Sequence, residues 1–102
     1  MKGIDELIDL TNKSFNCDPW IKEKGLAKFA SYLVEESNEA VDAIKNNDNE
    51  NLKEELGDIL SVWLTTCKLA NFDKNEIINI AINKIKHRRP YEIGRASCRE
   101  RV

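Results

Sequence analysis

The sequence predicts an all-α protein, a small four-helix-bundle-like fold. Apolar residues recur at three- and four-residue intervals through most of the chain between residues 3 and 89. Neither the alternating apolar pattern of a strand nor an Asn-Gly or Asp-Gly hairpin turn is found. A 102-residue chain fits one small domain but buries only about two thirds of its unfolded surface, so we expect self-association to complete the fold.

The first helix is predicted at residues 4–13, where Ile4, Leu7 and Ile8 share a stripe. Residues 16–20 are predicted to form a loop, because Pro19 disfavours helical geometry at the preceding Asp18. The second helix is predicted at residues 26–46. Its apolar positions have the spacing of a half-buried helix: Leu26, Phe29, Ala30, Leu33, Ala40, Val41 and Ile44.

A polar run at residues 46–49 favours caps and turns, and it separates this helix from a third at residues 50–70. The third helix is expected to bury Leu52, Leu56, Ile59, Leu60, Trp63 and Cys67. A fourth begins near Asp73, which forms a capping-box pattern with Glu76, and ends before Pro90. We predict a domain at residues 1–93, and a disordered or vector-derived tail at 94–102, which lacks an apolar period.

Composition excludes several classes of protein. A net charge of -2 argues against a broad basic surface for nucleic acid. The chain has no signal peptide and no apolar stretch near the roughly 20 residues that span a bilayer, so we expect a cytoplasmic protein without membrane contact. Cys17, Cys67 and Cys98 lie far apart and the single histidine is His87, which argues against a zinc site or a disulfide framework.

Two acidic clusters are the most informative feature: EExxE from residue 35 and EExxD from residue 54. Residues three apart share a helix face, so Glu36 with Glu39, and Glu55 with Asp58, form two pairs. At ~1.5 Å of rise per residue, the pairs lie equally far from the turn near residues 47 and 48. We therefore predict that the four carboxylates converge on one side of a helical hairpin.

Such convergence is unfavourable without a cation, because like charges repel at short range. No lysine or arginine stands three or four positions from any residue of either cluster. An oxygen-only ligand set suits Mg²⁺, or Mn²⁺. The alternative is a solvated acidic face. Gly57 favours the metal site, since glycine within a helix costs ~1 kcal/mol relative to alanine and a close approach by a ligand or another helix would explain it.

These motifs resemble the signature of the MazG-type, all-α nucleotide pyrophosphohydrolases, EExxE followed by ExxD. Flanking segments are also similar to the family: CDPW at residues 17–20, YLVEE at 32–36, EELGDIL at 54–60 and RRPY at 88–91. The chain departs from the family in the additional Asp18 and in Ile21, Lys24 and Gly25, where the family often has Asp and then Gln-Thr.

The resemblance implies Mg²⁺-dependent hydrolysis of a nucleoside triphosphate to the monophosphate and pyrophosphate, with Glu36, Glu39, Glu55 and Asp58 as metal ligands. Either remaining acidic residue, Glu35 or Glu54, is a candidate for the general base or for a residue that orients it. The candidates for substrate binding are Lys84 and Arg88 for the phosphates, Lys22 as a further phosphate contact, and Trp20 for stacking on the base. For Lys84 and Arg88 the alternative is a solvated basic helix end, and for Trp20 it is ordinary packing.

Other functions remain open at this point. Phosphoribosyl-ATP pyrophosphohydrolase and dimeric dUTPase share the fold and the carboxylate pattern. A non-catalytic helical interaction module that keeps an acidic surface is the alternative from a different class. Val62 and Leu69 lie outside the main apolar stripe of the predicted third helix, which leaves apolar surface for a partner. Together with the resemblance, this leads us to expect a homodimer or homotetramer.

Overall fold

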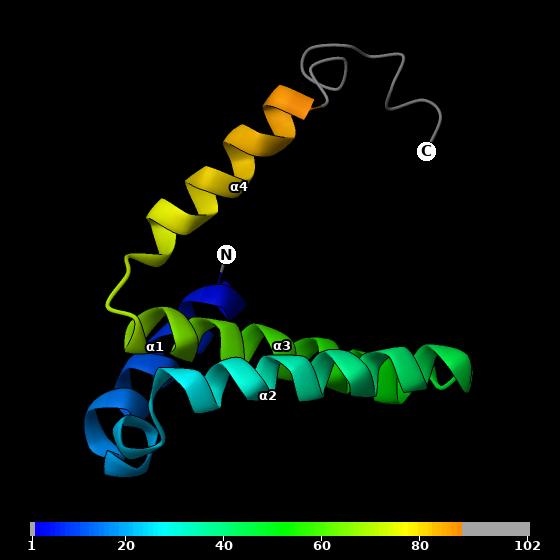
Figure 1. Ribbon diagram of the computed structural model, residues 1–102, viewed down its shortest axis with the longest axis horizontal. Coiled ribbons are helices and arrows are strands. Elements are labelled where there is room, and N and C mark those ends of the chain that lie inside the picture. The colour runs from blue at the N-terminus through cyan, green and yellow to red at the C-terminus, as the bar shows by residue number, and fades with distance from the viewer. Residues whose placement is uncertain (1, 89–102) are drawn as a thin grey trace. The chain divides into compact units, whose positions relative to one another are not determined.

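The computed structural model describes residues 2–88, which form four helices: α1 (Lys2–Cys17), α2 (Pro19–Lys45), α3 (Asn49–Leu69) and α4 (Lys74–Arg88) (Figure 1). No strand occurs within that range, as the sequence predicts. The chain divides into two compact units, Met1–Asn71, which holds α1, α2 and α3, and a second from Phe72 onward, which holds α4. None of the described helices is both long and apolar enough to cross a membrane.

Helices α2 and α3 lie side by side as an antiparallel hairpin (Figure 1). The connection falls where it was predicted. Asn47 has a φ of 55°, a left-handed conformation that asparagine tolerates, and it reverses the chain direction. Asp48 then caps α3, because its Oδ1 accepts a hydrogen bond from the backbone N–H of Asn51 at 3.1 Å. Helix α1 packs against both members of this hairpin.

The predicted loop at residues 16–20 is mostly helical. Helix α1 continues to Cys17 and α2 begins at Pro19, so Asp18 alone lies outside the helices. Asp18 is extended, as the following proline requires, and its Oδ1 accepts the N–H of Trp20 at 3.0 Å. Helix α2 is interrupted at Gly25, whose φ of 79° is left-handed, and its regular part therefore starts at Leu26, as expected.

The core of the first unit is small. Its buried apolar residues are Ile21, Phe29, Ala40, Ala43, Leu64 and Cys67. Several predicted core positions are exposed instead: Leu26, Val41, Ile44, Leu56 and Leu60. On α2 the physical reason is that Ala40 and Ala43 form the buried seam, which leaves the larger Val41 and Ile44 on its flank. Trp63 is half-buried rather than enclosed.

Helix α4 begins where it was predicted, because Oδ1 of Asp73 accepts the backbone N–H of Asn75 at 3.0 Å. It carries large exposed apolar side chains: Ile78, Ile80, Ile82 and Ile85. The predicted tail, residues 94–102, and the domain boundary at residue 93 lie outside the described residues, and that division stays a prediction.

Candidate metal centre

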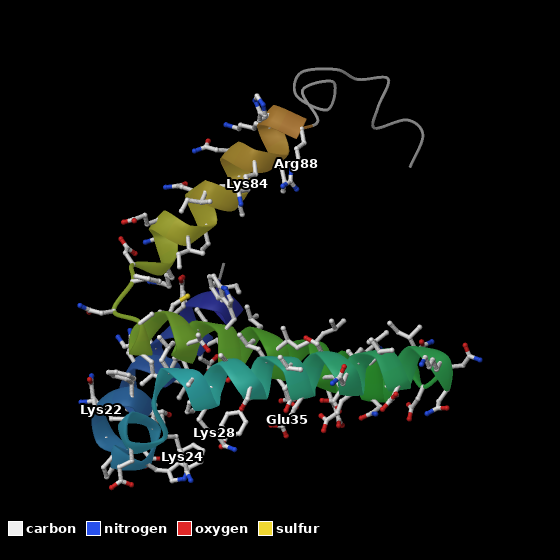
Figure 2. The ribbon with its side chains drawn as sticks, viewed as in Figure 1. Lys22, Lys24, Lys28, Glu35, Lys84 and Arg88 are labelled. Carbon is white, nitrogen blue, oxygen red and sulfur yellow. The ribbon has the colours of Figure 1, made fainter. Side chains whose placement is uncertain are left out.

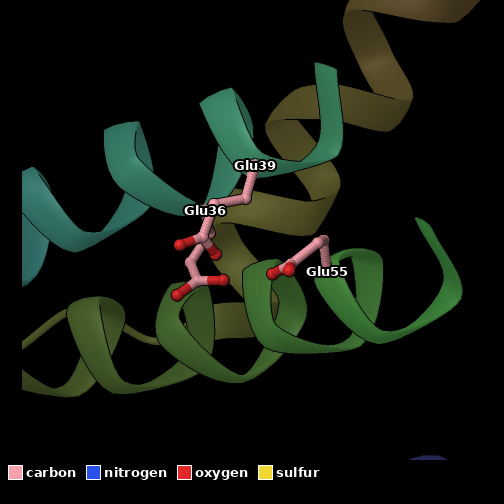
Figure 3. Close-up of side chains that lie close together, drawn as sticks. All are labelled: Glu36, Glu39 and Glu55. Carbon is pink, nitrogen blue, oxygen red and sulfur yellow. The ribbon is translucent and has the colours of Figure 1, made fainter. Parts of the chain in front are cut away.

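Three carboxylates meet between α2 and α3: Glu36, Glu39 and Glu55. One oxygen from each lies within 4.8 Å of the others, and Figure 3 shows the three side chains pointing toward one another from the two helices. Glu36 and Glu55 are half-buried and Glu39 is exposed. The hairpin alignment is responsible, because each helix contributes residues at matching distances from the turn.

Two oxygens of this group are buried without any hydrogen-bond partner among residues 2–88: Oε2 of Glu36 and Oε1 of Glu55. A proton shared with Glu36 is the largest cause that raises the pKa of Glu55, from 4.5 to about 7, and burial and the charge of Glu39 add to it. Without a cation, the carboxyl of Glu55 therefore keeps its proton to a much higher pH than an ordinary glutamate does.

The pKa of Glu36 is raised as well. Its hydrogen bond with Glu55 lowers this pKa, but burial and the negative charges of Glu39 and Asp58 together raise it more. Asp58 is exposed and does not belong to the group of three, although its charge acts on Glu36. Since aspartate is one methylene shorter than glutamate, it reaches less far from the backbone of α3. The metal-binding roles of all four residues stay predictions.

The chemistry of this group fits a hard divalent cation. All its atoms are oxygens, and two of them are buried and unpartnered. The one ion pair within residues 2–88 joins Lys53 to Glu50 at 3.3 Å and does not involve the group. Within α1, α2 and α3 no lysine or arginine forms an ion pair with the group, so a cation would supply positive charge that these helices do not.

The two candidates for the general base, Glu35 and Glu54, are exposed on the same two helices (Figure 2 labels Glu35). Their roles stay predictions. Gly57 corrects one argument from the sequence: a Cβ atom built there would meet nothing within 4 Å. Within the first unit neither α1 nor α2 approaches it, so the close approach that the sequence argument invoked is not made by these helices.

The candidates for substrate binding lie in different places. Trp20 is 44% exposed and stacks on Tyr32, with ring centroids 6.4 Å apart, and its edge meets Phe29. Nζ of Lys22 lies 5.1 Å from the ring centroid of Phe15. Lys84 and Arg88 are exposed, four residues apart on α4 in the second unit (Figure 2), and their approach to the acidic group stays a prediction.

Sequence reasoning missed two lysines beside the aromatic residues. Nζ of Lys24 lies 5.6 Å from the ring centroid of Trp20, and Nζ of Lys28 lies 5.5 Å from that of Tyr32 (Figure 2). The four-residue spacing of Lys24, Lys28 and Tyr32 was the available signal. These cations are held by the faces of the rings and are free of carboxylate partners within the described chain.

Comparison with known proteins identifies the family of the chain. The chain matches the MazG nucleotide pyrophosphohydrolase domain over residues 24–93. It is 33% identical over 105 residues to the nucleoside triphosphate pyrophosphohydrolase of Escherichia coli K12, an alignment that covers 96% of this chain and 40% of that protein. Its relative of the same name in Mycolicibacterium smegmatis is 28% identical, over 83% of this chain and 28% of that protein.

The fold is also similar to the crystal structure of a mazG-related protein from Thermotoga maritima. The TM-score is 0.82 at 28% identity, over 88% of this chain and 82% of that one. This match confirms the predicted all-α, four-helix fold. The chain belongs to the MazG nucleotide pyrophosphohydrolase family. It spans about 40% of the length of the Escherichia coli relative.

Proposed function

We propose that this chain is a Mg²⁺-dependent hydrolase that converts a nucleoside triphosphate to the monophosphate and pyrophosphate. The observation that supports it best is the pair of buried, unpartnered oxygens of Glu36 and Glu55, within a group of three convergent carboxylates. Structural carboxylates of a helical hairpin are ordinarily solvated or paired. Two neighbouring carboxylates that each keep a buried oxygen without a partner are typical of a site that a cation completes.

In this proposal Glu36, Glu39 and Glu55 hold the cation, and Asp58 joins them by a change of side-chain rotamer. A bound Mg²⁺, or Mn²⁺, would polarise the phosphate oxygens and lower the pKa of an attacking water. Glu35 or Glu54 accepts the proton of that water or orients the residue that does. The attack is at the α-phosphorus and pyrophosphate leaves.

The proposed contacts to the phosphates of the substrate follow from charge. Lys84 and Arg88 share a helix face and neutralise charge that develops on the polyphosphate, and Lys22 contributes from α2. Trp20 contacts the base.

We further propose that the working form is a homodimer or homotetramer. Large apolar side chains remain exposed on α2 and α3, among them Val34 at 60%, Ile44 at 59% and Leu56 at 54%. Monomers rarely leave contiguous apolar surface of this kind uncovered.

The alternative functions are phosphoribosyl-ATP pyrophosphohydrolase, a dUTPase-type activity and a non-catalytic interaction module.

The test is pyrophosphate release in millimolar Mg²⁺ from the standard ribo- and deoxyribonucleoside triphosphates and phosphoribosyl-ATP. We expect Glu36→Gln and Asp58→Asn to reduce turnover at least 100-fold, the order of loss when a group that stabilises the transition state is removed. Glu50→Gln is the matched control, since Glu50 is an exposed glutamate of α3 outside the group, and it should retain activity. Turnover in both site variants would contradict the metal assignment, and no turnover of any substrate by the parent chain would favour the interaction module.

A further inference from the structure

A cavity of about 300 Å³ opens in the first unit, between α1, the beginning of α2 and the second half of α3. Trp20 and Phe29 give it aromatic walls. Its polar lining consists of five side chains, Thr11, Ser14, Asp18, Ser61 and Thr65. The volume is at the lower end of the range for ligand pockets, so it suits one ring system rather than a whole nucleotide.

The polar lining is rich in hydrogen-bond acceptors. The hydroxyl of Thr11 donates its proton to the carbonyl of Leu7 at 2.8 Å, and that of Thr65 donates to the carbonyl of Ser61 at 3.2 Å. Both threonine oxygens therefore face the cavity as acceptors only. Asp18 can only accept, and while its Oδ1 receives the N–H of Trp20, no hydrogen bond within residues 2–88 engages Oδ2. The hydroxyls of Ser14 and Ser61 can serve either way.

The cavity continues from the acidic group along α2, and from the neighbouring Asp58 along α3. On α3, Ser61 follows Asp58 by three residues and Thr65 follows it by seven, which places all three on one face. On α2, Phe29 precedes Glu36 by seven residues and lies on the same stripe. At ~1.5 Å of rise per residue, the cavity begins roughly 9–10 Å from the acidic group. A ligand bound at both places would hold a phosphate at one end and a ring at the other.

We propose that this cavity is the base subsite and that Asp18 makes it selective for bases with an exocyclic amino group. This inference rests on the proposed function. Asp18 is exposed and lines the cavity together with further acceptors, and its carboxylate attracts the N–H donors of an amino group and repels a carbonyl oxygen at the same position. Adenine and cytosine present an amino group where hypoxanthine and uracil present an oxygen. The chain therefore prefers the amino member of each pair.

Asp18→Asn is the decisive variant. Asparagine caps a helix as well as aspartate does, so the bond to the N–H of Trp20 is kept by the amide oxygen. The amide NH₂ then takes the position of Oδ2 and donates where the carboxylate accepted. We expect kcat/KM of the parent chain to be at least tenfold higher for ATP than for ITP and for CTP than for UTP. Both ratios should fall at least tenfold in Asp18→Asn.

Asp48→Asn is the matched control, because Asp48 also caps a helix, α3, but does not line the cavity. It should leave both ratios unchanged. Binding of AMP and IMP, measured by calorimetry, tests the subsite without any turnover. If the parent chain binds AMP more tightly than IMP and Asp18→Asn removes this preference, the subsite is supported. If no triphosphate is hydrolysed in that case, only the proposed function fails. Hydrolysis of all four triphosphates with ratios near one, or ratios unaffected by Asp18→Asn, would overturn the inference and leave the proposed function standing.

Discussion

Glu36 on α2 and Glu55 on α3 meet across the hairpin, each with a buried oxygen that has no hydrogen-bond partner among the described residues. In the absence of a cation the contact is tolerable while a proton is shared between them, which is why the pKa of Glu55 rises to about 7. Proton and cation therefore compete for the same oxygens. Most of the expected behaviour of this protein follows from that competition.

The stability of the metal-free chain should fall as pH rises. The carboxyl of Glu55 has a pKa of about 7 in the folded chain, against 4.5 for an ordinary glutamate. Between these two pH values the folded state holds a proton that the unfolded state has lost. The contribution of Glu55 to the stability of the folded state is therefore complete below pH 4.5 and disappears as pH rises through 7. Thermal unfolding in EDTA, followed by circular dichroism, should give a lower Tm at pH 8 than at pH 6. Glu55→Gln should flatten this dependence, and an equally steep profile in that variant would contradict the assignment.

Mg²⁺ should raise Tm, and more at pH 8 than at pH 5.5, because it binds only the ionised carboxylates. Saturation at 100 times Kd is worth ~2.7 kcal/mol, which shifts Tm by roughly 10 °C or more for a domain of this size. The measurement is a melt at increasing millimolar Mg²⁺. Glu36→Gln should abolish the shift while Glu50→Gln keeps it. An identical shift in Glu36→Gln would place the ion elsewhere.

Gly57→Ala should stabilise the isolated chain by about 1 kcal/mol. Glycine in a helix interior costs this much relative to alanine, and the space beside Gly57 is open. Urea unfolding of dilute protein checks it. Loss of stability instead of a gain would show that a second copy of the chain occupies that space.

Self-association should depend on the exposed apolar stripe of α2. Val41 is 46% exposed, so Val41→Lys should leave the helical content unchanged and shift the molar mass in light scattering toward that of the monomer. Asp42→Lys introduces the same side chain at the next, exposed position and should leave the assembly intact. Equal mass for Val41→Lys and the parent chain would mean that the interface lies elsewhere.

Much of the fold was determined by local sequence. Helical periodicity, the polar turn at residues 46–49 and the Asp73 cap place three of the four helices within a few residues of their observed bounds, because each depends on neighbours along the chain. Glu39 lies about as far before that turn as Glu55 lies after it, and this matching distance was enough to predict that the acidic residues of the two helices meet. The boundary between α1 and α2 was predicted wrongly from Asp18 and Pro19. A five-residue loop was expected, but Asp18 is a single extended residue that ends α1 and caps α2.

Tertiary packing decided the rest. Periodicity alone does not specify which neighbour each face of α2 meets. That neighbour decides why Ala40 and Ala43 are buried at the seam while Val41 and Ile44 are exposed. The cavity beside Asp18 exists because α1, α2 and α3 bring residues 7–29 together with residues 61–65. The sequence by itself thus determined which residues carry charge and on which helix face they stand. Their burial, their protonation and the shape of the space beside them arise from contacts between segments far apart in the chain.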